Sequence, residues 1–109
     1  MAIAEGGCLC GAARYAVQAE PTHVNICHCH FCQRATGAPY LVEPIFAKEA
    51  FSVSTGELAR YSQTSEGIGK AVNTNFCADC GTELFLDFEG SQNAIGVYGV
   101  ANVDKRRHR

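Results

Sequence analysis

The hydrophobic positions of this 109-residue chain fall into short runs, and little of the pattern persists at a helical period. The runs are rich in β-branched and aromatic residues and are separated by Gly, Pro, Ser and Asn, a pattern typical of strands joined by turns. A spacing of roughly ten residues between runs indicates an all-β sandwich or barrel. The predicted strands cover residues 13–18, 23–27, 40–46, 51–54, 58–62, 70–76, 83–88 and 94–101.

One segment has the pattern of a helical turn. This is residues 30–37, "HFCQRATG", where Gly37 and Pro39 would end the helix. The Gly-x-Gly within residues 65–71 lacks the third glycine and the strand–helix context of a nucleotide-binding loop, so we predict a hairpin turn there. Because no linker or low-complexity tract interrupts the pattern, we predict one domain over residues 1–104.

Charge and hydropathy narrow the class of protein. The formal net charge is -2, but four of the nine basic residues lie within residues 105–109. Residues 1–104 therefore carry five basic and eleven acidic residues, a formal net charge of -6. An acidic body with a basic tail, which we expect to be disordered, is a poor nucleic-acid surface. No apolar run approaches the roughly eighteen residues of a membrane span, and the N-terminal sequence lacks the basic and apolar regions of a signal peptide. We therefore predict a cytoplasmic protein, in which thiols stay reduced.

The seven cysteines are the most informative feature of the sequence for function. An odd number cannot all pair as disulfides, and clustered cysteines in a reducing compartment are typical of metal-binding or catalytic sites. A C-x-x-C followed directly by glycine suits a tight turn that presents two sulfurs to one metal ion. The cysteines divide into four outer cysteines, Cys8, Cys10, Cys77 and Cys80, and three central cysteines, Cys27, Cys29 and Cys32.

Ligand counting favours two zinc sites. The two outer pairs together give a four-thiolate site, which is closed and structural, whereas the three central cysteines leave one coordination position open for water or substrate. The alternative is that Cys77 and Cys80 combine with two of the central cysteines, which would leave Cys8 and Cys10 without a metal. We favour the division into four and three.

The spacing of the central segment is consistent with this division. On an extended chain Cys27 and Cys29 project to one face, and His28 and His30 project to the other. Cys32 joins the first two cysteines only if the chain turns after residue 29, which the predicted helical turn allows. The histidines could supply a fourth ligand or a proton shuttle, but strand alternation favours an ordinary hydrogen-bonded or exposed role. His30 is the better candidate for orienting a ligand.

The ligand set also indicates the kind of chemistry. Three thiolates leave a bound Zn²⁺ with a local charge of about -1, which weakens its ability to acidify water. Such a site is better suited to exchanging a soft sulfur ligand than to hydrolysis. An anionic thiol substrate would need a cationic partner, and Arg34 is the first candidate, although it could be an ordinary surface arginine. Gln33 and Tyr40 are weaker candidates for orienting a substrate.

Three blocks of the sequence resemble the signature of a known family. The stretches "GGCLCGAARY", "CHCHFCQRATGAPY" and "FCADCGTEL" are similar to those of the glutathione-dependent formaldehyde-activating enzyme family, also called the centromere protein V type. The order and spacing of all seven cysteines agree over residues 6–104. The resemblance implies a small mainly-β fold of the Mss4-like type. It also implies a structural zinc on the outer cysteines and a catalytic-type zinc on the central cysteines.

The resemblance further implies carbon–sulfur lyase activity, the reversible addition of glutathione to formaldehyde that gives S-hydroxymethylglutathione. We therefore expect two Zn²⁺ ions per chain, a glutathione-like small-molecule thiol as partner, and the central cysteines with Arg34 as catalytic residues. The alternative is a non-enzymatic zinc-binding module for partner docking, metal storage or thiol redox sensing. The enzyme requires a concave pocket beside Cys29 with a cationic edge.

Overall fold

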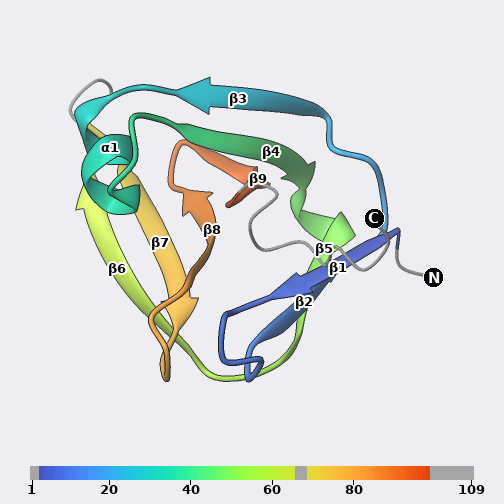
Figure 1. The fold of residues 1–109 in the computed structure, drawn as a ribbon. Helices are drawn as coiled ribbons and strands as arrows, with labels where there is room; N and C mark the ends of the chain where they lie inside the picture. Colours follow the sequence, from blue (N-terminus) through green and yellow to red (C-terminus); the bar gives the residue numbers. More distant parts are fainter. Residues whose placement is uncertain (1–2, 66–68, 99–109) are drawn as a thin grey trace.

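The computed structural model describes residues 3–65 and 69–98, which form two antiparallel sheets (Figure 1). One sheet has three strands in the order β1–β2–β5, and the other has six in the order β3–β4–β9–β8–β7–β6. The mainly-β prediction is confirmed. The strands are β1 (Ala4–Gly7), β2 (Arg14–Val17), β3 (His23–Cys27), β4 (Leu41–Ala47), β5 (Phe51–Thr55), β6 (Leu58–Thr64), β7 (Ala71–Cys77), β8 (Glu83–Phe88) and β9 (Ser91–Val97).

The predicted helical turn is present as α1 (His30–Thr36). Its N-cap is Cys29, whose sulfur accepts a hydrogen bond from the backbone N–H of Cys32 at 3.5 Å. The helix ends at Gly37, which has a φ of 72° and donates its N–H to the carbonyl of Gln33 at 2.8 Å. Glycine is favoured in this left-handed conformation because it has no Cβ. Within the described residues, no helix has the length and apolar character needed to cross a bilayer.

The two strands that flank the predicted hairpin turn at residues 65–71 pair with each other. β6 and β7 pair antiparallel from Leu58 opposite Cys77 to Thr64 opposite Ala71. At the base of the turn, the N–H of Ser65 donates to the carbonyl of Lys70 at 2.8 Å. Residues 66–68 lie outside the described residues.

Some elements differ from the sequence prediction. The sequence does not predict β1, because Gly6 and Gly7 have low strand propensity. β1 forms because it pairs with β2, with Gly6 opposite Tyr15. The short 3-10 helix η1 (Lys48–Ala50) is likewise unpredicted, and β9 begins three residues earlier than expected. Residues 99–101 of that predicted strand, and the tail at residues 105–109, lie outside the described residues.

Two hydrophobic clusters hold the layers together, and each includes cysteine side chains. The larger cluster lies between the two sheets and includes Cys8 and Cys77, of which Cys77 is 1% exposed. The smaller cluster lies beneath α1 and includes Cys32, which is 4% exposed. Because close-packed interiors resist displacement, these sulfurs have fixed positions. The smaller cluster is completed by Leu41, Leu86 and Tyr98.

Gly56, in the turn between β5 and β6, offers a test of the fold. Its φ is 98°, and a Cβ at this position would lie 2.5 Å from the Cα of Ala13 and 2.6 Å from the carbonyl oxygen of Ala12. We expect Gly56→Ala to lower the free energy of unfolding by about 2–4 kcal/mol, because backbone strain and steric overlap add. Urea unfolding measures this change. In the control Gly69→Ala, φ is 71° but a Cβ would have no neighbour within 4 Å among the described residues, so the loss should be about 1 kcal/mol. Equal losses of stability in the two variants would show that steric overlap at position 56 has no effect.

Candidate functional site

The four outer cysteines converge on one point of the fold. Their sulfurs all lie within 4.8 Å of one another. The sulfur of Cys10 lies 3.5 Å from that of Cys8 and 3.8 Å from that of Cys77. A tetrahedral zinc ion with Zn–S bonds of about 2.3 Å places its sulfurs about 3.8 Å apart. This set of side chains could therefore hold a metal ion.

Two tight turns present these sulfurs. Gly11 and Gly81 directly follow Cys10 and Cys80, with φ angles of 84° and 81°. The N–H of Gly81 donates to the carbonyl of Cys77 at 2.9 Å. Two further backbone N–H groups of the second turn donate to the Cys77 sulfur at 3.3 and 3.4 Å. The turns thus place hydrogen-bond donors where they stabilise a thiolate.

Thr82 connects the two turns, although it was not among the predicted site residues. Its hydroxyl oxygen accepts a hydrogen bond from the N–H of Leu9 at 3.1 Å and lies 3.1 Å from the sulfur of Cys80. The hydrogen bond from this hydroxyl, assisted by backbone hydrogen bonds, lowers the pKa of Cys80 to about 5. Thr82 therefore links the N-terminal turn to the C-x-x-C turn and favours the thiolate form of a cysteine in the set.

The three central cysteines form the second cluster. Their sulfurs also lie within 4.8 Å of one another, with 3.3 Å between those of Cys27 and Cys29. Cys27 ends β3, Cys29 caps α1, and Cys32 lies buried in the first turn of α1. The chain turns after residue 29, as predicted, and this turn brings Cys32 to the other two. The hydrogen bond from the backbone N–H of Cys32 lowers the pKa of Cys29.

Within each cluster, neighbouring sulfurs oppose one another's ionisation. The backbone N–H of Ala12 favours the thiolate of Cys10, yet the sulfur of Cys8 raises the pKa of Cys10 to about 12. Burial raises the pKa of Cys32, and the two neighbouring sulfurs raise it further. Closely spaced thiolates require a cation to ionise together. The chemistry of both donor sets therefore fits a bound metal ion.

The two histidines of the central segment lie outside the group of three sulfurs. The ring of His28 packs against Tyr40, with 5.5 Å between the ring centroids. His30, the first residue of α1, instead lines a cavity beside the central cysteines. His28 thus takes a structural position, and His30 is the histidine that faces a potential ligand.

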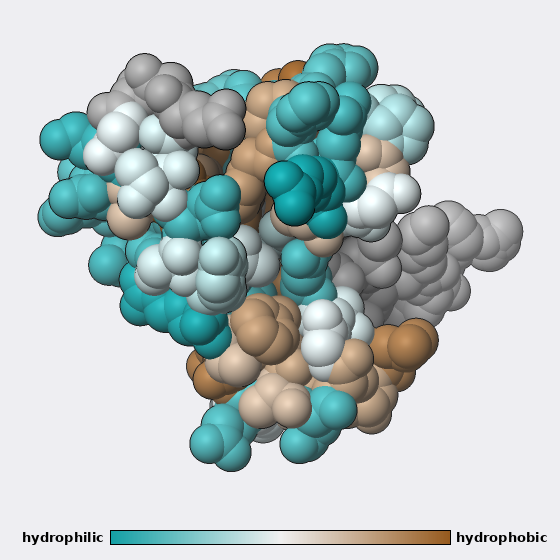
Figure 2. Space-filling view, turned by 90° about the vertical axis from the view of Figure 1, so that its left-hand side faces the viewer, coloured by the Kyte–Doolittle hydropathy of each residue, from teal (hydrophilic) through white to brown (hydrophobic). Residues whose placement is uncertain are grey.

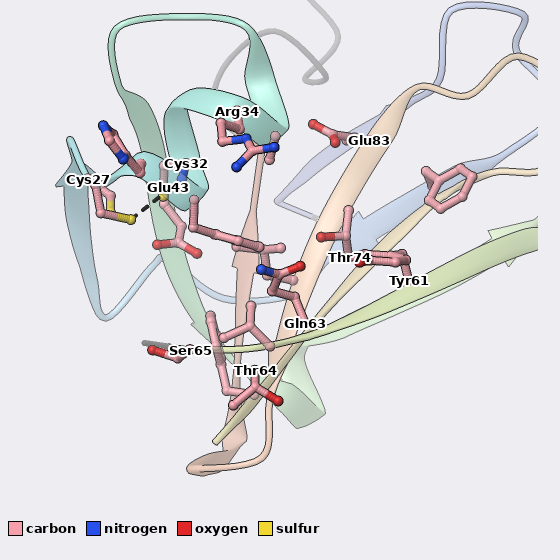
Figure 3. A pocket seen from close by; sticks show the side chains of 18 residues that line it. Cys27, Cys32, Arg34, Glu43, Tyr61, Gln63, Thr64, Ser65, Thr74 and Glu83 are labelled. Carbon is pink, nitrogen blue, oxygen red and sulfur yellow. Dashed lines mark hydrogen bonds between the residues drawn. The ribbon is translucent and has the colours of Figure 1, made fainter. Parts of the chain in front are cut away.

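A cavity of about 880 Å³ opens beside the central cysteines (Figure 3). It lies between α1 and strands β4, β6, β7 and β8, and it is lined by all three central cysteines and by none of the outer ones. Its size is within the range of small-molecule binding sites, roughly 300–1,000 Å³. Arg34 belongs to its wall, so a concave pocket whose lining includes a cationic side chain lies beside the central cysteines.

The wall of the cavity combines apolar and polar groups. Phe76 and Leu86 contribute apolar surface, while Figure 3 shows Arg34 on α1 and Glu83 on β8 near the same edge. Burial raises the pKa of Glu83, and a hydrogen bond with Tyr98 opposes this effect. On the side of the molecule where α1 and β6 lie, Figure 2 shows mostly hydrophilic side chains with more hydrophobic ones between them.

Glu43 on β4 is a further carboxyl group in the wall, and it was not among the predicted site residues. It is 7% exposed, and burial raises its pKa to about 7, against the opposing effect of a hydrogen bond from Asn25. One signal could have found it. Leu41 and Ile45 lie two residues before and after it, so a charged residue occupies an inward position of an alternating strand.

The chain is similar to known proteins in sequence and in fold. The family described as glutathione-dependent formaldehyde-activating enzyme matches residues 3–108. Among solved structures, the crystal structure of a Rhodobacter sphaeroides protein has the same fold, with a TM-score of 0.66 and 22% identity over 86% of this chain and 83% of that chain. The comparison with curated proteins gives no significant match. Since the family match covers nearly the whole sequence, the chain belongs to the glutathione-dependent formaldehyde-activating enzyme family.

Proposed function

We propose that this protein is a zinc-dependent carbon–sulfur lyase that acts on the thiol adduct of a small carbonyl compound, such as S-hydroxymethylglutathione. The observation that carries the proposal is the position of the central cysteines, which line the 880 Å³ cavity together with Arg34. The outer cysteines do not line it. A cluster of three thiols that opens onto a pocket favours an enzyme over a purely structural module. The family match supports the choice of thiol and carbonyl.

The donor sets fit two zinc ions with different roles. The central cysteines would hold a zinc that supplies a Lewis acid with an open position for a soft sulfur ligand. The outer cysteines would hold a zinc that contributes folding energy. The sulfur–sulfur distances of 3.5 and 3.8 Å in the outer set are close to the spacing in a tetrahedral zinc–thiolate site, whereas the 3.3 Å between the sulfurs of Cys27 and Cys29 is shorter than that spacing.

The residues of the cavity would align the two reactants. In the forward direction a C–S bond forms between the thiol sulfur and the carbonyl carbon, and the thiol proton ends on the former carbonyl oxygen. Cleavage reverses both changes. Holding the reacting atoms in contact replaces an encounter in solution, and this replacement is a large source of rate enhancement. The central cysteines define the sulfur end of the cavity, and Arg34 provides a cation for the carboxylates of glutathione.

The proposal is tested by measuring how fast free glutathione and its formaldehyde adduct interconvert. Exchange NMR spectroscopy with ¹³C-labelled formaldehyde gives this rate at equilibrium. We expect the rate to exceed the spontaneous one in proportion to protein concentration, and to return to the spontaneous rate when a chelator removes zinc. A protein that holds zinc at both clusters but leaves the rate unchanged would be a zinc-binding module instead.

Arg34 provides a test of substrate recognition. Because its side chain is exposed, we expect Arg34→Gln to raise the KM for glutathione by up to about fivefold, the effect of an exposed ion pair, with little change in kcat. The same variant should leave the KM for 2-mercaptoethanol unchanged, because that thiol has no carboxylate. Arg60 is a matched control, since its guanidinium pairs with Asp87 at 2.9 Å and does not line the cavity. An equal effect on both thiols would exclude the assigned role.

A further inference from the structure

Glu43 has an unusual environment for a carboxylate. Among the described residues, Glu43 is the only acidic or basic residue whose side chain is buried. It lines the same cavity as the central cysteines. Figure 3 shows its side chain extending into the cavity on the side of Cys27 and Cys32. Carboxylates are seldom buried without a partner. The position therefore requires a reason beyond packing.

The hydrogen bonds of Glu43 are incomplete. Asn25 lies opposite Glu43 in the pairing of β3 with β4, and its side chain forms a hydrogen bond with the carboxyl group. Oxygen Oε2 is buried and has no hydrogen-bond partner among the described residues. A buried acceptor without a donor destabilises the folded protein. Each carboxylate oxygen can accept two hydrogen bonds, so the bond with Asn25 leaves the carboxyl group able to accept another from a hydroxyl group in the cavity.

The neighbouring strand is shaped to hold this carboxylate. Gly96 on β9 lies beside Glu43, and a Cβ at Gly96 would overlap the Cγ, Cδ and Oε2 atoms of the glutamate. Only a glycine leaves room for the side chain in this position. The carboxylate is thus fixed by Asn25 on one side and by the bare backbone of Gly96 on the other.

We propose that Glu43 is a further substrate-contacting residue, whose carboxyl group accepts a hydrogen bond from the hydroxyl group of the thiol–carbonyl adduct. This inference rests on the proposed function, since it assigns the oxygen end of the same substrate. The adduct carries its hydroxyl on the carbon next to sulfur, so a group that binds this hydroxyl must lie close to the group that binds the sulfur. Glu43 meets this condition because it shares the cavity wall with the central cysteines. The free thiol has no such hydroxyl, so Glu43 would distinguish the adduct from glutathione.

Calorimetric titration of the zinc-loaded protein tests this assignment, with glutathione alone and with glutathione in the presence of excess formaldehyde. We expect Glu43→Leu to weaken adduct binding about tenfold and to leave glutathione binding unchanged. Glu43→Asp, which withdraws the carboxylate by one methylene, should show the same selective loss, about fivefold. Glu43→Gln keeps the shape and an acceptor oxygen, so it should remain within about twofold of the wild type. Glu49→Gln changes an exposed glutamate on η1 and is the matched control.

The outcomes separate this inference from the proposed function. If the wild type binds the adduct and accelerates exchange, but Glu43→Leu and Glu43→Asp bind the adduct as tightly as the wild type, the role of Glu43 is overturned and the proposed function stands. An equal loss of adduct and glutathione binding in these variants would also overturn it, because the effect would not depend on the hydroxyl. If the wild type neither binds the adduct nor accelerates exchange, both proposals fail.

Discussion

We expect Cys77→Ser to remove cooperative folding of the protein. Cys77 is 1% exposed, packs in the cluster between the two sheets, and contributes a sulfur to the outer set. A structural zinc site contributes about 10–16 kcal/mol to folding, whereas domains are stable by only about 5–15 kcal/mol in total. If the loss of one of four thiolates releases the zinc, the fold loses more free energy than its total stability. Circular dichroism during heating and zinc analysis of the purified variant measure the result.

The adjacent substitution Ala78→Ser serves as the control for this experiment. It introduces the same residue into the same turn, but at an exposed position that offers no ligand. The Ala78→Ser protein should keep both zinc ions and unfold within a few degrees of the wild type, since surface changes stay within about 0.5 kcal/mol. Chelation of zinc from the wild type should reproduce the unfolding seen in Cys77→Ser. A folded Cys77→Ser protein with a normal melting temperature would show that the outer set has no structural role.

The grouping of the cysteines could be predicted because it depends on local chain geometry. In the C-x-x-C turn, the glycine after Cys80 permits a left-handed conformation, and Gly81 adopts it with a φ of 81°. The turn after residue 29 was predictable for the same reason, since Gly37 ends a short helix that places Cys32 beside the other central cysteines. Local signals of this kind depend on neighbouring residues along the chain, so they can be recognised in the sequence.

Other features depend on pairing between distant segments, which the sequence does not display. β1 contains two glycines and forms because β2 lies beside it. Thr82 looks like an ordinary residue after a turn, but its hydroxyl joins Leu9, 73 positions away, to Cys80. Glu43 could be recognised as an inward position of its strand, yet the space that Gly96 leaves for it is known only from the pairing of β4 with β9. Long-range contacts decide such positions.

We expect Cys29→Ser to abolish turnover while the protein stays folded. Cys29 is exposed and caps α1, and serine is itself a favourable N-cap residue, so the helix should keep its start. Serine replaces a thiolate by a neutral hydroxyl, which is a poor ligand for zinc. The protein-catalysed rate of exchange between glutathione and its formaldehyde adduct, which is the observed rate minus the spontaneous one, should fall at least about 100-fold. Zinc content should fall from about two to about one per chain, with the melting temperature nearly unchanged.

His28→Ser is the matched control for Cys29→Ser, because it introduces serine at the preceding position. His28 packs on Tyr40 and lies outside the group of three sulfurs, so this variant should retain both zinc ions and turnover within about twofold. The comparison with Cys77→Ser then separates the two clusters by their effects on stability and on rate. If Cys29→Ser unfolds the protein as Cys77→Ser is expected to, or if it keeps substantial turnover, the division into a structural site and a reactive site is wrong. Loss of turnover in a folded protein with one zinc would locate the carbon–sulfur chemistry at the central cysteines, because the outer set would still be complete.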